Sequence, residues 1–103
     1  MEPFNIDTGP VQQKYQVTLS FEISDAFMAQ VPAHRTYINY LINKNIIDSY
    51  TVSFEAMRSW IIINGHSKKE VFQLLQHSPL YKYWTIEVDE LNVVDGQPDR
   101  LPA

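Results

Sequence analysis

The stretch SPLYKYWTIEVDELNVVDG, Ser78 to Gly96, decides the fold of this chain. It opens with Ser78-Pro79, and any preceding helix ends there because proline disfavours helical geometry in the residue before it. Aromatic and β-branched residues then follow at the density of a strand. From Tyr83 to Asp89 apolar and polar residues alternate, which predicts a strand with one buried face. The apolar positions change phase after Glu90, which predicts a bulge or bend near Asp89-Glu90.

The rest of the chain predicts three more strands and two helices. The expected strands are Lys14 to Glu22, Ile46 to Glu55 and Arg58 to Asn64, and the expected helices are Ser24 to Asn45 and Ser67 to His77. The first strand alternates cleanly, which is typical of a half-buried antiparallel strand. The third has a nearly continuous apolar run, which indicates a central position with both faces covered.

Local signals define the ends of the expected helices. Ser24 or Asp25 caps the first helix. Pro32 predicts that this helix breaks into a short first turn and a main helix that begins at the proline. Asn45 lies where a left-handed C-terminal cap is expected. In the second helix, Ser67 and Glu70 have the spacing of a capping box.

The order strand, helix, strand, strand, helix, strand predicts an α+β, ferredoxin-like βαββαβ fold. We expect a single domain over residues 14–96, a flexible N-terminal arm over residues 1–13 and a C-terminal tail over residues 97–103. The alternative for the arm is a segment that docks Phe4 and Ile6 on a partner subunit.

Composition excludes several classes of function. The 103 residues include no cysteine, so thiol chemistry and thiolate metal sites are excluded. The net charge is -4 and the basic residues are scattered, which argues against a nucleic-acid partner. No apolar run has the length of a membrane span, and no secretory leader is visible. We therefore expect a cytoplasmic protein without a membrane partner.

The block P-L-Y-x-Y-x-x-I-E-V-D-x-L, Pro79 to Leu91, resembles the C-terminal block of muconolactone isomerase-like proteins. A weaker resemblance extends from about Lys14 to Val94. Those proteins are dimeric α+β barrels, and their enzymes shift a double bond in a lactone ring by moving a proton, without metal or cofactor. The resemblance implies a homodimer or higher homo-oligomer, no cofactor, and a proton-transfer site with His34 or Glu55 as the base.

The motif A-H-R-x-Y-I-x-x-L, Ala33 to Leu41, resembles the helix of the related YCII-like proteins. In those proteins the histidine works with an aspartate that precedes a proline after the second helix. Ser78 stands at the matching position here, so a carboxylate would come from Glu22, Glu55 or Glu87 instead.

One face of the expected sheet is polar. It carries Gln16, Thr18, Ser20, Glu22, Ser49, Thr51, Ser53 and Glu55, and both helices are expected on the other face. In a dimer two such faces would enclose a cavity for water or a polar ligand, with Ser20 and Thr51 as ligand-binding candidates. In a monomer the same face would be solvated.

The other candidate residues each have a structural alternative. His34 takes a position in the apolar stripe of the first helix, either as a structural histidine or as a general acid or base. Arg35 and Arg58 would anchor a carboxylated ligand by bidentate pairing, or form surface salt bridges. Tyr81 and Trp84 would line the pocket, or belong to the core or a dimer interface. The three histidines lack metal-ligand spacing, so no metal site is expected.

Three functions remain open from the sequence. The first is a cofactor-free isomerase acting on a small polar molecule, carboxylated or a lactone. The second is a non-catalytic dimer that binds a small-molecule ligand in the same cavity. The third is a structural module closed only by a partner subunit.

Overall fold

Strands and helices of the described residues follow one another in the predicted βαββαβ order, and a 3₁₀ turn precedes the last strand. The computed structural model describes residues 12–96, so most of the expected arm (residues 1–13) and the whole expected tail (residues 97–103) lie outside the described residues. The elements are β1 (Gln13–Ser20), α1 (Asp25–Asn43), β2 (Ile47–Ser53), β3 (Arg58–Gly65), α2 (Lys68–Gln76), the 3₁₀ turn η2 (Tyr81–Tyr83) and β4 (Thr85–Leu91). The fold is α+β and ferredoxin-like.

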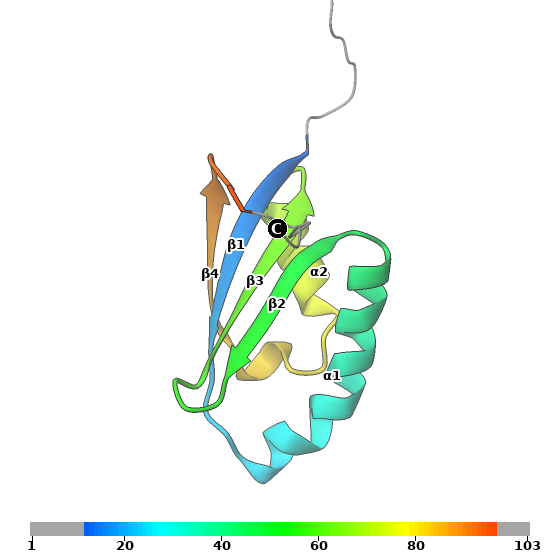
Figure 1. The fold of residues 1–103 in the computed structure, drawn as a ribbon. Helices are drawn as coiled ribbons and strands as arrows, with labels where there is room; N and C mark the ends of the chain where they lie inside the picture. Colours follow the sequence, from blue (N-terminus) through cyan, green and yellow to red (C-terminus); the bar gives the residue numbers. More distant parts are fainter. Residues whose placement is uncertain (1–11, 97–103) are drawn as a thin grey trace, which may run out of the picture.

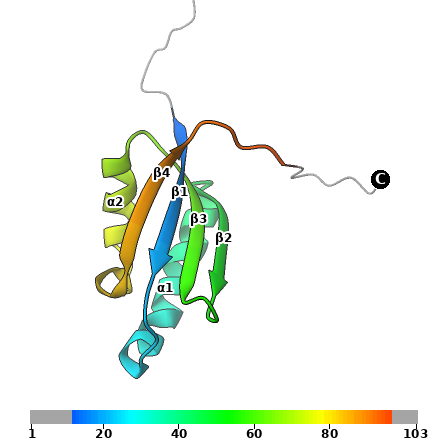
Figure 2. The same ribbon diagram turned by 90° about the vertical axis from the view of Figure 1, so that its left-hand side faces the viewer.

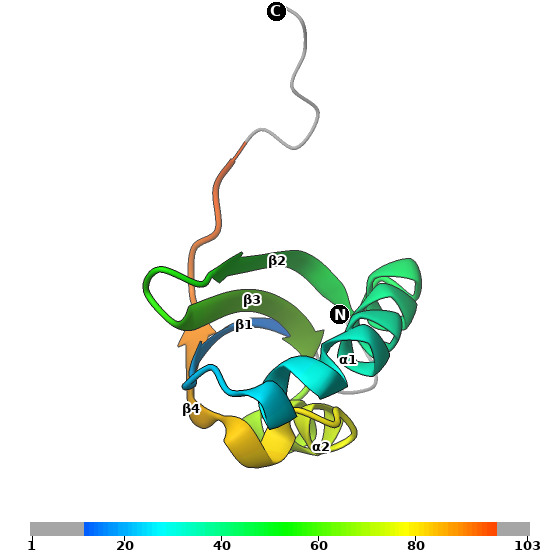
Figure 3. The same ribbon diagram turned by 90° about the horizontal axis from the view of Figure 1, so that it is seen from below.

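The four strands form one antiparallel sheet in the order β2-β3-β1-β4, with both helices on one side (Figures 1 and 3). Helix α1 lies against β2, and α2 lies against β3 and β4. In the middle of the sheet Val17 pairs with Ile61 on one side and Val88 on the other, and all three are buried under the helices. Figure 2 shows the opposite side of the sheet, which no element of the described chain covers.

Strand β3 is central, as predicted, but only one of its faces is covered by helices. Ile61 and Ile63 are completely buried on the helix side. Trp60 and Ile62 point to the open side and are half-buried. The prediction that both faces are covered is therefore wrong for the chain by itself.

The predicted bulge near Asp89-Glu90 is also wrong. Pairing between β1 and β4 runs without interruption from Lys14 opposite Leu91 to Ser20 opposite Thr85. The irregularity lies in β2, between Ile47 and Ser49. There the Asp48 carboxylate pairs with Lys14 and accepts a hydrogen bond of 2.8 Å from the Asn64 amide. Because the regular pairing of β4 places Leu91 opposite Lys14, the apolar Leu91 side chain lies on the open side of the sheet.

Helix α1 continues through Pro32, so the predicted break does not occur. Its first turns, cyan in Figure 1, are inclined to the remainder of the helix. Pro32 is exposed, so the hydrogen bond that its missing N–H cannot make is lost on the solvent side, where water can compensate. The ends of the helix agree with prediction: the Ser24 hydroxyl accepts from the backbone N–H of Phe27 at 3.1 Å, and Asn45 has the left-handed φ of 63°.

The interior consists of two clusters of buried side chains. The larger one lies between the sheet and the helices and includes Val17, Ile38 and Leu75. The smaller one consists of Phe21, Phe27 and Leu80, at the end of the sheet where α1 begins. This smaller cluster fixes the inclined first turns of α1 to the end of β1. Among residues 12–96, neither helix is long and apolar enough to cross a membrane.

Candidate functional site

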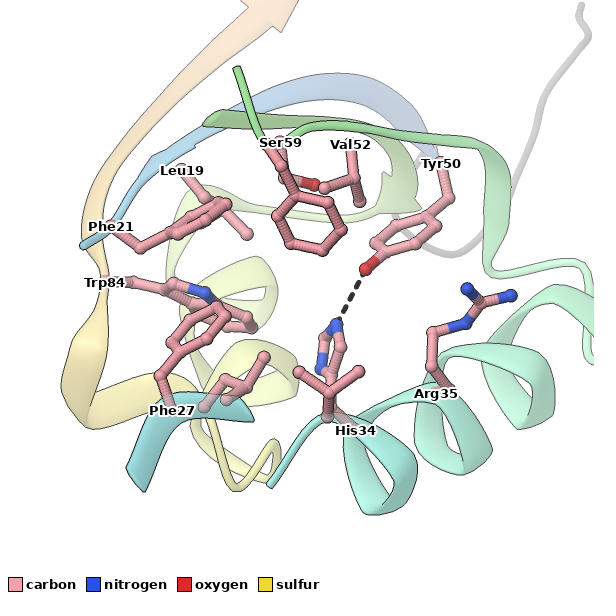
Figure 4. Close-up of a pocket in the computed structure, with 12 residues that line it drawn as sticks. Leu19, Phe21, Phe27, His34, Arg35, Tyr50, Val52, Ser59 and Trp84 are labelled. Carbon is pink, nitrogen blue, oxygen red and sulfur yellow. Dashed lines mark hydrogen bonds between the residues drawn. The ribbon is translucent and has the colours of Figure 1, made fainter. Parts of the chain in front are cut away.

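A pocket of about 60 Å³ lies between α1 and the helix side of the sheet (Figure 4). Its volume exceeds the roughly 15 Å³ that one water needs, so it has room for several waters or for part of a small ring. Its walls come from α1, from β1, β2 and β3 with the residues that directly follow β1 and β2, and from the segment before β4: Leu19, Phe21, Phe27, Val31, His34, Arg35, Tyr50, Val52, Phe54, Ser59, Leu80 and Trp84. It therefore lies on the opposite side of the sheet from the polar face, where a cavity between two subunits was expected.

The pocket exists because α1 covers β2 only in part. Phe27 stacks on Phe21 with ring centroids 4.8 Å apart, which draws the start of the helix toward the end of β1. The outer end of β2 is left without a helix above it. Val52 and Phe54 remain 39% and 51% exposed there, although they point to the helix side. These two side chains form the open rim of the pocket.

His34 forms the polar centre of the pocket wall. It is buried, with 2% of its surface exposed, and both ring nitrogens are hydrogen-bonded. Nε2 lies 2.9 Å from the Tyr50 hydroxyl, and Nδ1 lies 2.8 Å from the Ser78 hydroxyl. Burial, and after it the positive charge of Arg35, lowers the pKa of His34 to about 4. The imidazole is therefore neutral at physiological pH.

Tyr50 brings its hydroxyl from β2 to meet His34 (Figure 4). Burial raises the pKa of this phenol, while Arg35 and the neighbouring Ser59 hydroxyl act in the opposite direction. Tyr50 is therefore protonated at neutral pH and can donate a hydrogen bond. The Arg35 guanidinium carbon lies 5.9 Å from the centroid of the Tyr50 ring, and the side chain is exposed at the rim.

Aromatic rings form the opposite wall. Trp84 contacts His34 edge-on, with ring centroids 5.3 Å apart and an interplanar angle of 77°. Phe54 meets Phe21 edge-on at 6.4 Å. Such walls favour a flat, apolar body in the ligand, because aromatic groups interact through stacked and edge-on contacts. The site thus combines an apolar slot with one hydroxyl and one guanidinium.

The structure brings together three of the predicted site residues and separates the rest. His34, Arg35 and Trp84 line the pocket. Ser20 and Arg58 line a different, open groove of about 610 Å³ beside the turn between β2 and β3.

The remaining three candidates line neither the pocket nor the groove. Thr51 points to the open side of the sheet, where its hydroxyl donates to the carbonyl oxygen of Trp60 at 3.1 Å. Glu55 is exposed in the turn between β2 and β3. Tyr81 begins η2 and packs against the larger core cluster.

Two polar residues of the site were not among the predicted site residues. In the sequence Tyr50 alternates with polar residues on the apolar side of its strand, and its phenol hydroxyl on that side is the signal that could have identified it. Ser78 was noted only because it occupies the position of an aspartate in YCII-like proteins. The structure places that position against His34, and the serine hydroxyl makes the contact there.

No metal centre is formed by the described residues: between residues 12 and 96, no three His, Asp or Glu side chains are grouped to hold an ion. No protein-family model matches this sequence, and no curated protein matches it at a significant level. The class defined by fold and site is therefore a ferredoxin-like α+β protein with a small aromatic pocket beneath its sheet.

Proposed function

We propose that this protein binds a small molecule with a flat, apolar body and one polar group in the pocket between α1 and β2, without a cofactor. The observation that carries the proposal is the Tyr50–His34 hydrogen bond of 2.9 Å in the wall of an otherwise aromatic cavity. Small-molecule sites commonly combine an apolar lining with a few placed polar groups. The exposed rim formed by Val52 and Phe54 gives access, and a ligand larger than the cavity can extend past it.

Binding is tested by titrating indole and benzoate into ¹⁵N-labelled protein and following amide chemical shifts. We expect the shifts to concentrate on the residues that line the pocket. Val52→Trp should fill the rim and weaken binding about fivefold or more, because even one misplaced group in a close-packed site costs on the order of 1–3 kcal/mol. Val94→Trp is the matched control, because Val94 has a similar exposure of 46% and lies outside the pocket. Equal binding by both variants would reject the pocket as the site.

A second candidate is a cofactor-free isomerase that moves a proton on a small carboxylated molecule or a lactone. The resemblance of Pro79 to Leu91 to muconolactone isomerase-like proteins favours it. So does the pairing of a phenol and an imidazole, two groups that commonly transfer protons. The difficulty is that both nitrogens of His34 are already bonded and no carboxylate lines the pocket.

Catalysis is tested by incubating unsaturated lactones with the protein in D₂O and following loss of the proton next to the carbonyl by NMR. An isomerase would accelerate exchange or move the double bond, and Tyr50→Phe would remove the effect. Exchange no faster than in buffer alone would leave ligand binding as the function.

We also propose that two copies associate through the open side of the sheet. Trp60, Ile62 and Leu91 lie on this side among polar residues and are only half-buried in the single chain. An apolar strip on an uncovered sheet face is a feature of association surfaces. Sedimentation equilibrium of the wild type and of Trp60→Glu tests this: a dimer that the variant converts to monomer is expected, and a monomeric wild type would reject it.

A further inference from the structure

Each ring nitrogen of His34 is hydrogen-bonded to a hydroxyl, so the distances by themselves do not identify the nitrogen that carries the proton. A neutral imidazole has one N–H donor and one bare acceptor nitrogen. The partners on both sides are hydroxyls, Ser78 at Nδ1 and Tyr50 at Nε2, and a hydroxyl can donate or accept. The position of the proton therefore decides what Tyr50 offers to a ligand.

Ser78 determines the position of that proton. Its side chain is buried, with 5% of the residue exposed, so its hydroxyl proton needs an acceptor within the protein. The Ser78 oxygen already accepts from the backbone N–H of Leu80 at 3.0 Å. Among the hydrogen bonds of residues 12–96, the acceptor available to its proton is Nδ1 of His34, at 2.8 Å. Ser78 thus donates to Nδ1, and the imidazole proton must be on Nε2.

This assignment fixes the direction of the next hydrogen bond. Nε2–H donates to the Tyr50 oxygen over 2.9 Å, so the phenol proton is not used on His34. The adjacent Ser59 hydroxyl gives its own proton to the carbonyl oxygen of Thr51 at 2.8 Å, which leaves its oxygen as a neutral acceptor beside the phenol. A ligand carboxylate is a stronger acceptor for the phenol proton than this hydroxyl. We propose that the Tyr50 hydroxyl is the hydrogen-bond donor of the pocket and that its ligand presents an acceptor oxygen, a carboxylate, to it. His34 and Ser78 are positioning residues in this arrangement, and His34 is not a base.

The charge beside Tyr50 favours an anionic acceptor. Arg35 lines the same pocket next to the Tyr50 ring, and no carboxylate in the described part of the chain is paired with it. A guanidinium and a hydroxyl can bind the two oxygens of one carboxylate, and hydrogen bonds to a charged group are the stronger kind. The inference specifies the polar end of the ligand and rests on the ligand-binding function proposed above. The ligand class is a small, flat aromatic acid.

The proton position is measured directly from the ¹⁵N shifts of the histidine ring, which distinguish a protonated from a bare nitrogen. We expect His34 in the wild type to carry its proton on Nε2. Ser78→Asp should reverse this, because an ionised carboxylate only accepts and would hold the proton on Nδ1. Ser78→Ala removes the donor without supplying a new acceptor and should give a mixture of both forms. A wild-type proton on Nδ1 would overturn the inference, while the pocket itself could still bind ligands.

The ligand class is tested with benzoate against benzylamine, which has a similar ring but only donors. Wild type should bind benzoate at least tenfold more tightly than benzylamine, and Tyr50→Phe should lose about tenfold or more of its benzoate affinity, since a bond to a charged group contributes about 1.5–3 kcal/mol. Tyr40→Phe, at an exposed tyrosine outside the pocket, is the matched control. Arg35→Gln should weaken benzoate binding, and Arg58→Gln should not.

The two experiments separate the two proposals. Equal benzoate affinity in wild type and Tyr50→Phe would overturn the role of Tyr50 while leaving a binding pocket. If neither benzoate nor indole bound at all, the proposed function would fall together with the ligand class, whatever the proton position.

Discussion

Acid should destabilise this protein through His34 before its carboxyl groups are protonated. Burial and Arg35 lower the pKa of His34 to about 4 in the folded chain, against an ordinary value of 6.5. Between these two values the unfolded chain binds a proton that the folded chain does not. The free energy of unfolding is therefore at its full value above the ordinary pKa and falls as the pH decreases toward the folded pKa.

The size of the loss follows from the two pKa values. Linkage predicts a decrease of about 2 kcal/mol by about pH 5 and about 3 kcal/mol by about pH 4. A domain of this kind has a total stability of roughly 5–15 kcal/mol, so the loss is a large share of it. The lowered carboxyl pKa values of Asp48 and Glu70 act at lower pH, because their ordinary values are 3.8 and 4.5.

His34→Gln tests this, because glutamine can still hydrogen-bond but does not titrate. Urea unfolding should be measured for both proteins at several pH values between about 7.5 and 4.5. The variant will be less stable overall, but its stability should change much less across this range than that of the wild type. His77→Gln, at an exposed histidine, should retain the wild-type dependence. Parallel curves for wild type and His34→Gln would refute the argument that burial keeps this imidazole neutral.

Three further substitutions test the fold. Ser67→Ala should lower the free energy of unfolding by about 1 kcal/mol, because the hydroxyl that accepts from the Glu70 N–H at the start of α2 is lost. The urea midpoint of this variant should fall, and that of the exposed control Ser49→Ala should not. Met57→Asn should raise the free energy of unfolding by up to about 1 kcal/mol, because Met57 has a left-handed φ of 55°, which asparagine adopts more readily; an unchanged urea midpoint would argue against strain in this turn. Phe27→Ala should cost about 3–5 kcal/mol by opening the smaller core cluster, and a loss below about 1 kcal/mol would show that the inclined start of α1 is not held by this ring.

The strand and helix order was predictable because local patterns carry it. Alternation in β1 places Tyr15, Val17 and Leu19 on one side, and all three are buried. The capping box at Ser67 and the left-handed Asn45 also follow from local chemistry. The resemblance to muconolactone isomerase-like proteins stays a prediction.

Features that depend on distant residues were not predictable. The register of β4 is set by its partner β1, so Leu91 follows the pairing and not its own apolar pattern. The helix passes through Pro32, and its first turns are held by the contact of Phe27 with Phe21, which the local pattern around the proline does not reveal. The stripe in α1 identified His34, but its partners are 16 and 44 residues away in the chain.

The imidazole of His34 also links segments that are distant in the sequence by hydrogen bonds. It connects α1 to β2 through Tyr50, and to the segment entering β4 through Ser78, so both βαβ halves of the sequence meet at one ring. Separating the two halves leaves Nδ1 of His34 and the Ser78 hydroxyl without their hydrogen-bond partners. The amide protons of these segments are then released in a shared opening event, and hydrogen exchange in the two halves becomes cooperative.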